Sequence, residues 1–199
     1  MSPAATAARR CGVAEGGFVL ARGLVPARML RSIDALMRSR AAAVMTALGD
    51  RPIGLGSVNG YDELVQRSHN RWDVPMTERD LTEVFGPRGS LAPEVPWLGL
   101  VREALGPDAT PSFCGVVFSD PGSPPQQWHI DSPHEAPEHR PAHAVNVLLA
   151  LSDIPLSMGP TEVAPGTHVL TNHLRPERSW LSRDDMLYQT ELEYTPETL

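Results

Sequence analysis

The sequence contains no lysine, and all 17 basic residues of the 199-residue chain are arginines. Schiff-base catalysis, a kinase-type catalytic lysine and a phosphate-loop lysine all need a primary amine, so these three kinds of chemistry are excluded. The 24 acidic residues give a formal net charge of -7. This balance argues against non-specific nucleic-acid binding, which needs positive surface opposite the phosphates.

Cysteines and long apolar runs are also scarce. The two cysteines, Cys11 and Cys114, provide no disulfide framework, and they fit a reducing, cytoplasmic compartment. No run of 18 apolar residues is present, so we expect no membrane span. The first ten residues lack the apolar core of a secretory signal, although the end of an organelle-targeting segment is left open. We expect residues 1–14 to form a disordered tail.

Proline and glycine, in contrast, are abundant. The chain has 20 prolines and 16 glycines, and its proline content is about twice the usual 5%. This composition argues against a helical bundle and favours short strands joined by turns. With 41% hydrophobic and 21% charged residues, the chain is long enough for one self-sufficient core. We therefore expect a single domain over residues 15–199.

Helical patterns dominate the first half of the chain, after a short predicted strand over residues 17–22. Pro26 opens a helix whose apolar positions recur every three or four residues as far as Gly49. Thr77 and Asp80 have the spacing of a capping box, which predicts a second helix ending near residue 86. A third helix is predicted over residues 96–105.

Strand patterns follow in the second half, over residues 113–118, 126–130, 144–151 and 161–164. Helices followed by strands predict an α+β fold, compatible with a jelly roll that carries N-terminal helices. A jelly roll has eight strands, and only four or five are found here. We therefore expect its last strands to be missing, and an open sheet edge that another chain could cover.

A metal half-site is predicted in residues 127–131 (QWHID). A His-x-Asp pair on a strand directs both side chains to one face, so His129 and Asp131 would converge. One imidazole and one carboxylate are two of the three ligands of the facial triad that holds non-haem Fe(II). The nearby His134, His139 and His143 are interpreted as exposed loop residues.

Three motifs in order carry a resemblance to a known family. They are residues 127–131 (QWHID), 146–153 (NVLLALSD) and 159–168 (GPTEVAPGTH). Together with the opening unit over residues 17–48, they resemble the phytanoyl-CoA dioxygenase family over roughly residues 15–175. The resemblance implies a non-haem Fe(II)- and 2-oxoglutarate-dependent oxygenase on a double-stranded β-helix (jelly-roll, cupin-like) core. Such an enzyme hydroxylates or otherwise oxidises a C–H bond of a small organic substrate, with release of succinate and CO2.

The resemblance also assigns roles to individual residues. It implies that His129 and Asp131 are iron ligands. Four further residues would contact 2-oxoglutarate or line its cavity: Gln127, Thr161, Arg71 and Asn146. Structural alternatives stay open for three of them. Thr161 could cap a turn, Asn146 could satisfy buried backbone groups, and Arg71 could pair with Asp73.

The third iron ligand has no clear position in the sequence. The resemblance implies a downstream histidine, and about ten residues later an arginine for the distal carboxylate of 2-oxoglutarate. After the PGTH turn that ends at His168, which is interpreted as structural, the chain offers only His173 and three arginines, Arg175, Arg178 and Arg183. Four hypotheses remain: a truncated oxygenase, strands supplied by another chain, a cupin-like metalloprotein without 2-oxoglutarate, and a catalytically silent binding or assembly subunit.

Overall fold

A computed structural model describes residues 13–55, 61–126, 129, 131, 142–169 and 197–198. The helices are α2 (Ala27–Leu48), α3 (Glu78–Phe85) and α4 (Leu98–Leu105), with short 3-10 helices at Gly89–Leu91, Leu156–Met158 and Thr167–Val169. The strands are β1 (Val65–Ser68), β2 (Arg71–Pro75), β3 (Gly115–Ser119), β4 (Glu162–Val163) and β5 (Glu197–Thr198). All strand pairings between them are antiparallel. The chain is therefore a mixed helical and antiparallel-sheet protein, and the α+β expectation is confirmed.

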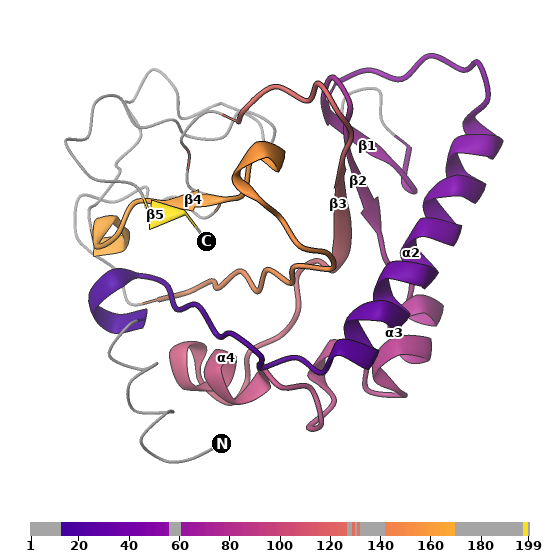
Figure 1. Ribbon diagram of the computed structural model, residues 1–199. Helices are drawn as coiled ribbons and strands as arrows, with labels where there is room; N and C mark the ends of the chain where they lie inside the picture. The colour runs from indigo at the N-terminus through magenta and orange to yellow at the C-terminus, as the bar shows by residue number, and fades with distance from the viewer. Residues whose placement is uncertain are drawn as a thin grey trace, which may run out of the picture.

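The long helix α2 packs along one side of the central sheet (Figure 1). It starts directly after Pro26, and it ends at Gly49, whose N–H donates to the carbonyl of Met45. Ile33 and Met37, one turn apart, are its buried residues, and they share a core cluster with Leu64 and Val74. Burying each such side chain contributes about 1.5–3 kcal/mol. The predicted helix is confirmed within one residue at each end.

The central sheet has the order β1-β2-β3 and two different faces. Trp72 and Val74 of β2 lie opposite Phe118 and Val116 of β3, and these four side chains pack on the α2 side. Because side chains alternate along a strand, Arg71 and Asp73 lie on the other face. The sequence predicted β3 two residues early and missed the β1–β2 hairpin.

The shorter helices close the other end of the core. Thr77 and Asp80 form the predicted capping box at the start of α3, and Gly86 ends that helix. Phe85 at the end of α3 meets Trp97, just before α4, edge to face, with ring centroids 5.6 Å apart. The α4 helix confirms the prediction over 96–105, starting two residues later.

Asp80 connects α3 to α2. It is 6% exposed, and its Oδ2 lies 3.2 Å from Nη1 of Arg40, which also donates from Nε to the Pro75 carbonyl. Burial acts to raise the pKa of the Asp80 carboxyl. Hydrogen bonds from the hydroxyl and backbone amide of Thr77, with the charges of Arg40 and Arg79, outweigh burial and lower that pKa. The ionised carboxylate thus holds two helices and the end of β2 together.

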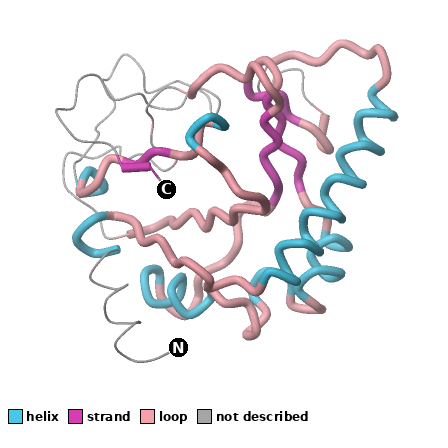
Figure 2. The backbone as a smooth tube through the Cα atoms, in the orientation of Figure 1, coloured by secondary structure: helices cyan, strands magenta, loops and turns pink. Residues whose placement is uncertain are grey.

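Two predicted strands are wrong. Residues 17–22 follow a helical turn at 13–16 as irregular chain, and residues 144–151 form no strand, although they run extended (Figure 2). In the second segment the apolar pattern is real, because Leu149 and Leu151 pack on the core. However, a strand also needs a hydrogen-bonded neighbour, and the described residues supply none beside this segment. The predicted strand at 161–164 is present as β4, which pairs with β5.

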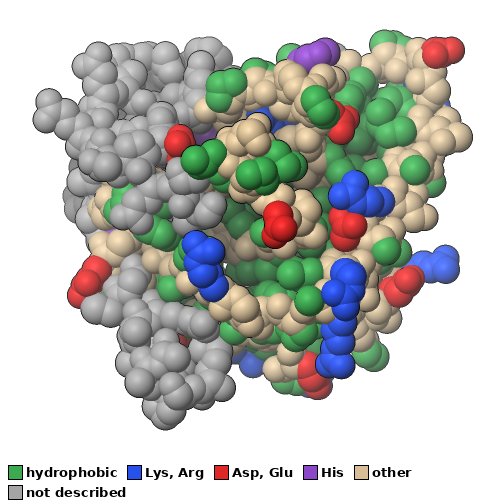
Figure 3. All heavy atoms as spheres, in the orientation of Figure 1, with side chains coloured by type: hydrophobic (Ala, Val, Ile, Leu, Met, Phe, Trp, Pro, Cys, Tyr) green, Lys and Arg blue, Asp and Glu red, His purple; other side chains and the backbone are tan. Residues whose placement is uncertain are grey.

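The surface carries scattered charges. On the face seen in Figure 3, arginine and acidic side chains lie among each other over the described part of the molecule. Among the described residues, no helix is both long enough and apolar enough to cross a bilayer.

Candidate functional site

His129 and Asp131 bring their side chains together. Nε2 of His129 lies 3.3 Å from Oδ1 of Asp131, and the side chains are 21% and 48% exposed. Both remain reachable from solvent. The sequence predicted this pair on a strand, but His129 and Asp131 belong to none of the strands given above, and their side chains lie close together all the same.

Asn146 joins this pair from the extended segment after residue 142. Its side-chain amide donates to Oδ2 of Asp131, so the two carboxylate oxygens have different partners. The hydrogen bond from His129 is the main reason why the pKa of the Asp131 carboxyl is lowered. Partial burial opposes this effect, while the charge of His129, the Asn146 amide and the charge of Arg67 add to it. Asp131 is therefore held as an ionised acceptor.

Arg67 is a site residue that the sequence interpretation missed. It lies between Gln66 and Ser68, where the register of β1 shifts against β2, and a shift of this kind changes the direction of a side chain. Its Nε lies 2.5 Å from Oδ2 of Asp73, which is 7% exposed. The sequence did contain a signal for the turn between β1 and β2. Asn70 lies in that turn with φ of 58°, a conformation that asparagine tolerates.

Arg71 does not pair with Asp73, so that alternative is wrong. Its Nε donates to Oγ of Ser119 at 3.1 Å, and its Nη1 donates to Oγ of Ser68 at 3.3 Å. Asp73 is instead taken by Arg67. The two serines belong to the strands on either side of β2, so Arg71 is fixed from both sides.

The structure describes only some of the remaining predicted residues. Thr161 is exposed and precedes β4, and within the described ranges it makes no hydrogen bond to His129 or Asp131. Gln127 lies outside the described residues, as do His134, His139 and His173. His143 is exposed, as expected.

No third metal ligand is found in the part of the chain that the structure describes. The described residues contain no cluster of three or more histidine, cysteine or acidic side chains. Nε2 of His168 lies 3.1 Å from the carbonyl oxygen of Ala14, so this ring packs on the N-terminal segment. The structural interpretation of the PGTH turn agrees with this position.

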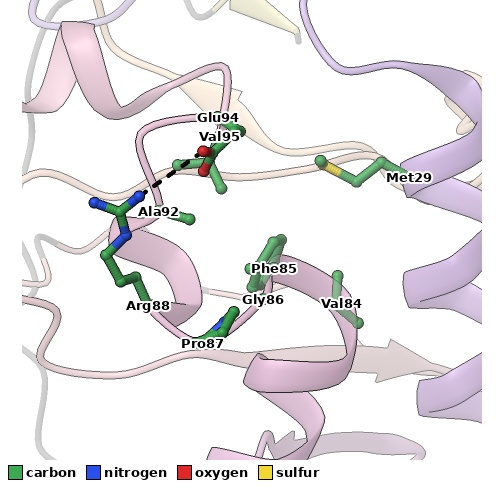
Figure 4. A pocket seen from close by; sticks show the side chains of 9 residues that line it. All are labelled: Met29, Val84, Phe85, Gly86, Pro87, Arg88, Ala92, Glu94 and Val95. Carbon is green, nitrogen blue, oxygen red and sulfur yellow. Dashed lines mark ion pairs between the residues drawn. The ribbon is translucent and has the colours of Figure 1, made fainter.

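A separate cavity of about 350 Å³ lies between α2, the end of α3 and the loop that follows it (Figure 4). Apolar side chains such as Met29, Phe85 and Val95 line it. Arg88 and Glu94 form a 3.8 Å ion pair at its wall, and both are well exposed. The lining contains none of the residues predicted for the metal site.

Comparison with known proteins gives one finding. No curated protein and no solved structure matches the chain at a significant level. The family model described as phytanoyl-CoA dioxygenase (PhyH) matches residues 13–196, which include His129, Asp131 and Asn146. Because this match spans nearly the whole chain, the protein belongs to the phytanoyl-CoA dioxygenase family.

Proposed function

We propose that this chain is a non-haem Fe(II)- and 2-oxoglutarate-dependent oxygenase that oxidises a C–H bond of a small organic substrate, releasing succinate and CO2. Family membership supports oxygenase chemistry at the level of the family. The observation that carries the proposal for this chain is the approach of the His129 imidazole to the Asp131 carboxylate at 3.3 Å. We also propose the double-stranded β-helix as the core, on the basis of the family.

The donor set fits a divalent iron. An imidazole nitrogen and a carboxylate oxygen are two members of the facial triad. Nε2 of His129 and Oδ1 of Asp131 lie 3.3 Å apart, so a single divalent ion could contact both donor atoms. The lowered pKa of Asp131 keeps this oxygen ionised, as a metal ligand must be.

The other residues orient these two ligands. Asn146 holds Oδ2 of Asp131, which leaves Oδ1 directed at His129. A second partner of this kind fixes a ligating carboxylate before the metal arrives. Bound Fe(II) would supply the activation of O2 by means of 2-oxoglutarate. The protein supplies placement of the reactants and exclusion of water.

We keep the co-substrate contacts as part of the proposal. The family resemblance is the support for contacts between 2-oxoglutarate and four residues: Gln127, Thr161, Arg71 and Asn146. For Arg71, an additional argument is that two serine hydroxyls hold its guanidinium in place. Planar guanidinium groups suit carboxylates because they offer parallel N–H donors.

The test is an anaerobic Fe(II) titration of the 199-residue chain, followed by a succinate assay with 2-oxoglutarate and O2. We expect Fe(II) uptake in the wild type, with a visible absorption band on addition of 2-oxoglutarate, and a loss of uptake in His129→Ala and Asp131→Ala. His69→Ala is the matched control, since His69 is exposed at the hairpin turn. Wild-type uptake no greater than that of His129→Ala would reject the enzyme and favour the silent subunit.

The cupin-like alternative has its own outcome in the same experiment. Iron binding that depends on His129 but is unaffected by 2-oxoglutarate, with no visible band and no succinate, would support a metalloprotein without this co-substrate. Circular dichroism of each variant shows whether lost uptake reflects the site or the fold.

A further inference from the structure

The cavity between α2, the end of α3 and the loop after α3 is large enough for a ligand (Figure 4). Its volume of about 350 Å³ lies at the small end of the range of about 300–1,000 Å³ that is usual for ligand pockets. Protein interiors are close-packed, so spaces much larger than a water molecule are few. Apolar cavities of about 150 Å³ are known to bind benzene, and this cavity therefore has room for a molecule with one ring.

The walls of the cavity are apolar, and most of them are fixed in place. Ala92 and Val95 are 3% and 4% exposed and belong to one core cluster. Phe85 is held by its edge-to-face contact with Trp97. Met29 reaches in from the side of α2 (Figure 4), and an unbranched methionine can adapt its shape to a ligand. The cavity thus offers a preformed surface to a compact apolar body, with one adjustable side chain.

Two charged side chains of opposite sign lie at the wall of the cavity. Arg88 and Glu94 are the only charged side chains among the described residues that line it, and their closest nitrogen and oxygen atoms are 3.8 Å apart. This distance is too long for a hydrogen bond, so both groups can still bond to a ligand.

This arrangement favours an uncharged head group. A carboxylate beside Arg88 would also lie beside Glu94, and an ammonium beside Glu94 would also lie beside Arg88. For either charged group, attraction and repulsion oppose each other. A hydroxyl has both a donor and acceptors, so it can accept from a guanidinium and donate to a carboxylate at the same time.

We propose that this cavity binds a small uncharged molecule with a compact apolar body and a hydroxyl group, of the class of the aromatic alcohols. The apolar body would lie among Met29, Phe85 and Val95, and the hydroxyl would accept from Arg88 and donate to Glu94. The site goes beyond the proposed function, because its lining contains none of the residues predicted to bind the metal or the co-substrate.

The experiment is an NMR titration of the metal-free chain with three probes that share one ring: benzyl alcohol, benzoate and benzylammonium. We expect benzyl alcohol to shift the methyl signals of Met29 and Val95 and to bind more tightly than either charged probe. Val84→Phe adds bulk to the lining and should weaken the binding of benzyl alcohol about tenfold. Val117→Phe is the matched control, because Val117 is 59% exposed on β3, outside the lining, and it should change nothing.

The charge pair gives a second prediction. Glu94→Gln leaves Arg88 without its opposite charge, so the affinity for benzoate should rise about two- to fivefold, the effect of one exposed ion pair. Arg88→Gln should raise the affinity for benzylammonium by a similar factor. Both side chains are well exposed, so these substitutions should leave the fold intact. Arg31→Gln, at an exposed position of α2, changes the net charge as Arg88→Gln does and is its control.

The proposal is overturned if benzyl alcohol binds Val84→Phe as tightly as the wild type, or if the three probes bind the wild type equally well. Circular dichroism shows whether Val84→Phe folds, and the two charge variants test the site even if it does not. Since the probes need no metal, their failure to bind is distinguishable from a failure of iron uptake or of succinate formation.

Discussion

The imidazole ring of His168 lies against the α-carbon of Gly17. A β-carbon at position 17 would be 2.5 Å from Nδ1 of His168, and Gly17 has φ of +81°. Beside this contact, the N–H of Gly166 donates to the carbonyl of Gly16 at 2.9 Å. The N-terminal segment and the turn after β4 thus hold each other, and glycine is required at position 17 for two reasons.

Gly17→Ala should loosen this contact. Positive φ costs an alanine about 1–2 kcal/mol, and the overlap with His168 adds to that cost. The measurement is hydrogen exchange of the Gly166 amide, which should accelerate. Gly23→Ala is the matched control, because Gly23 also has positive φ but has nothing within 4 Å of its missing β-carbon. Equal effects on Gly166 exchange in both variants would contradict the contact.

Asn146→Ala should weaken metal binding without removing a ligand. Asn146 donates to one oxygen of Asp131, and losing such a supporting partner typically reduces metal affinity about 10–100-fold. The measurement is a Mn(II) or anaerobic Fe(II) titration. Ser152→Ala, an exposed position of the same segment, is the control. Unchanged affinity in Asn146→Ala would show that the amide does not orient Asp131.

Asp80→Asn should destabilise the protein by about 1–3 kcal/mol at pH 7, because it weakens the capping box and leaves Arg40 without its carboxylate. The folded-state pKa of Asp80 is lowered. Its contribution is therefore complete above the unfolded pKa of about 3.9 and is lost as the pH falls through the lower folded pKa. Urea denaturation at pH 7 and below pH 4 measures the difference in the free energy of unfolding between the wild type and Asp80→Asn.

The difference between wild type and Asp80→Asn should accordingly narrow below pH 4. Asp34→Asn is the control, since Asp34 pairs with the well exposed Arg38 on the surface of α2. We expect no measurable change in that variant. A difference between wild type and Asp80→Asn that does not depend on pH would rule out the ionised carboxylate as the cause.

Met37→Ala should cost about 2–5 kcal/mol in the free energy of unfolding, because Met37 is completely buried between α2 and the sheet. Met45→Ala on the same helix is the comparison, since Met45 is 41% exposed. Chemical denaturation should give a much smaller loss for Met45→Ala. Similar losses would mean that the packing of α2 differs from the one described.

The helices could be predicted because their signals are local. These signals act within one or two turns, and they predicted the ends of α2 and α3 almost to the residue. They are Pro26, the Thr77–Asp80 capping box and Gly86. Strands depend on partners elsewhere in the chain. Residues 144–151 have an apolar pattern but no hydrogen-bonded neighbour among the described residues, whereas β2 is paired with β1 on one side and with β3 on the other.

The same distinction applies to the site. The approach of His129 to Asp131 was predicted from two positions of one segment, although the structure places neither residue in the strand from which the prediction was argued. Arg67 could not be found in this way. Its side chain joins Asp73 through a register shift between β1 and β2, and its charge reaches Asp131, 64 positions further along the chain (131 - 67).

Leu149 gives the segment after residue 142 a second role. It packs against both core clusters, and it lies three residues after Asn146, which holds the Asp131 carboxylate. The segment therefore connects the packing of the core, through Leu149, to the position of the candidate metal ligand Asp131, through Asn146. Substitutions in the core near Leu149 should therefore change metal affinity before they unfold the protein.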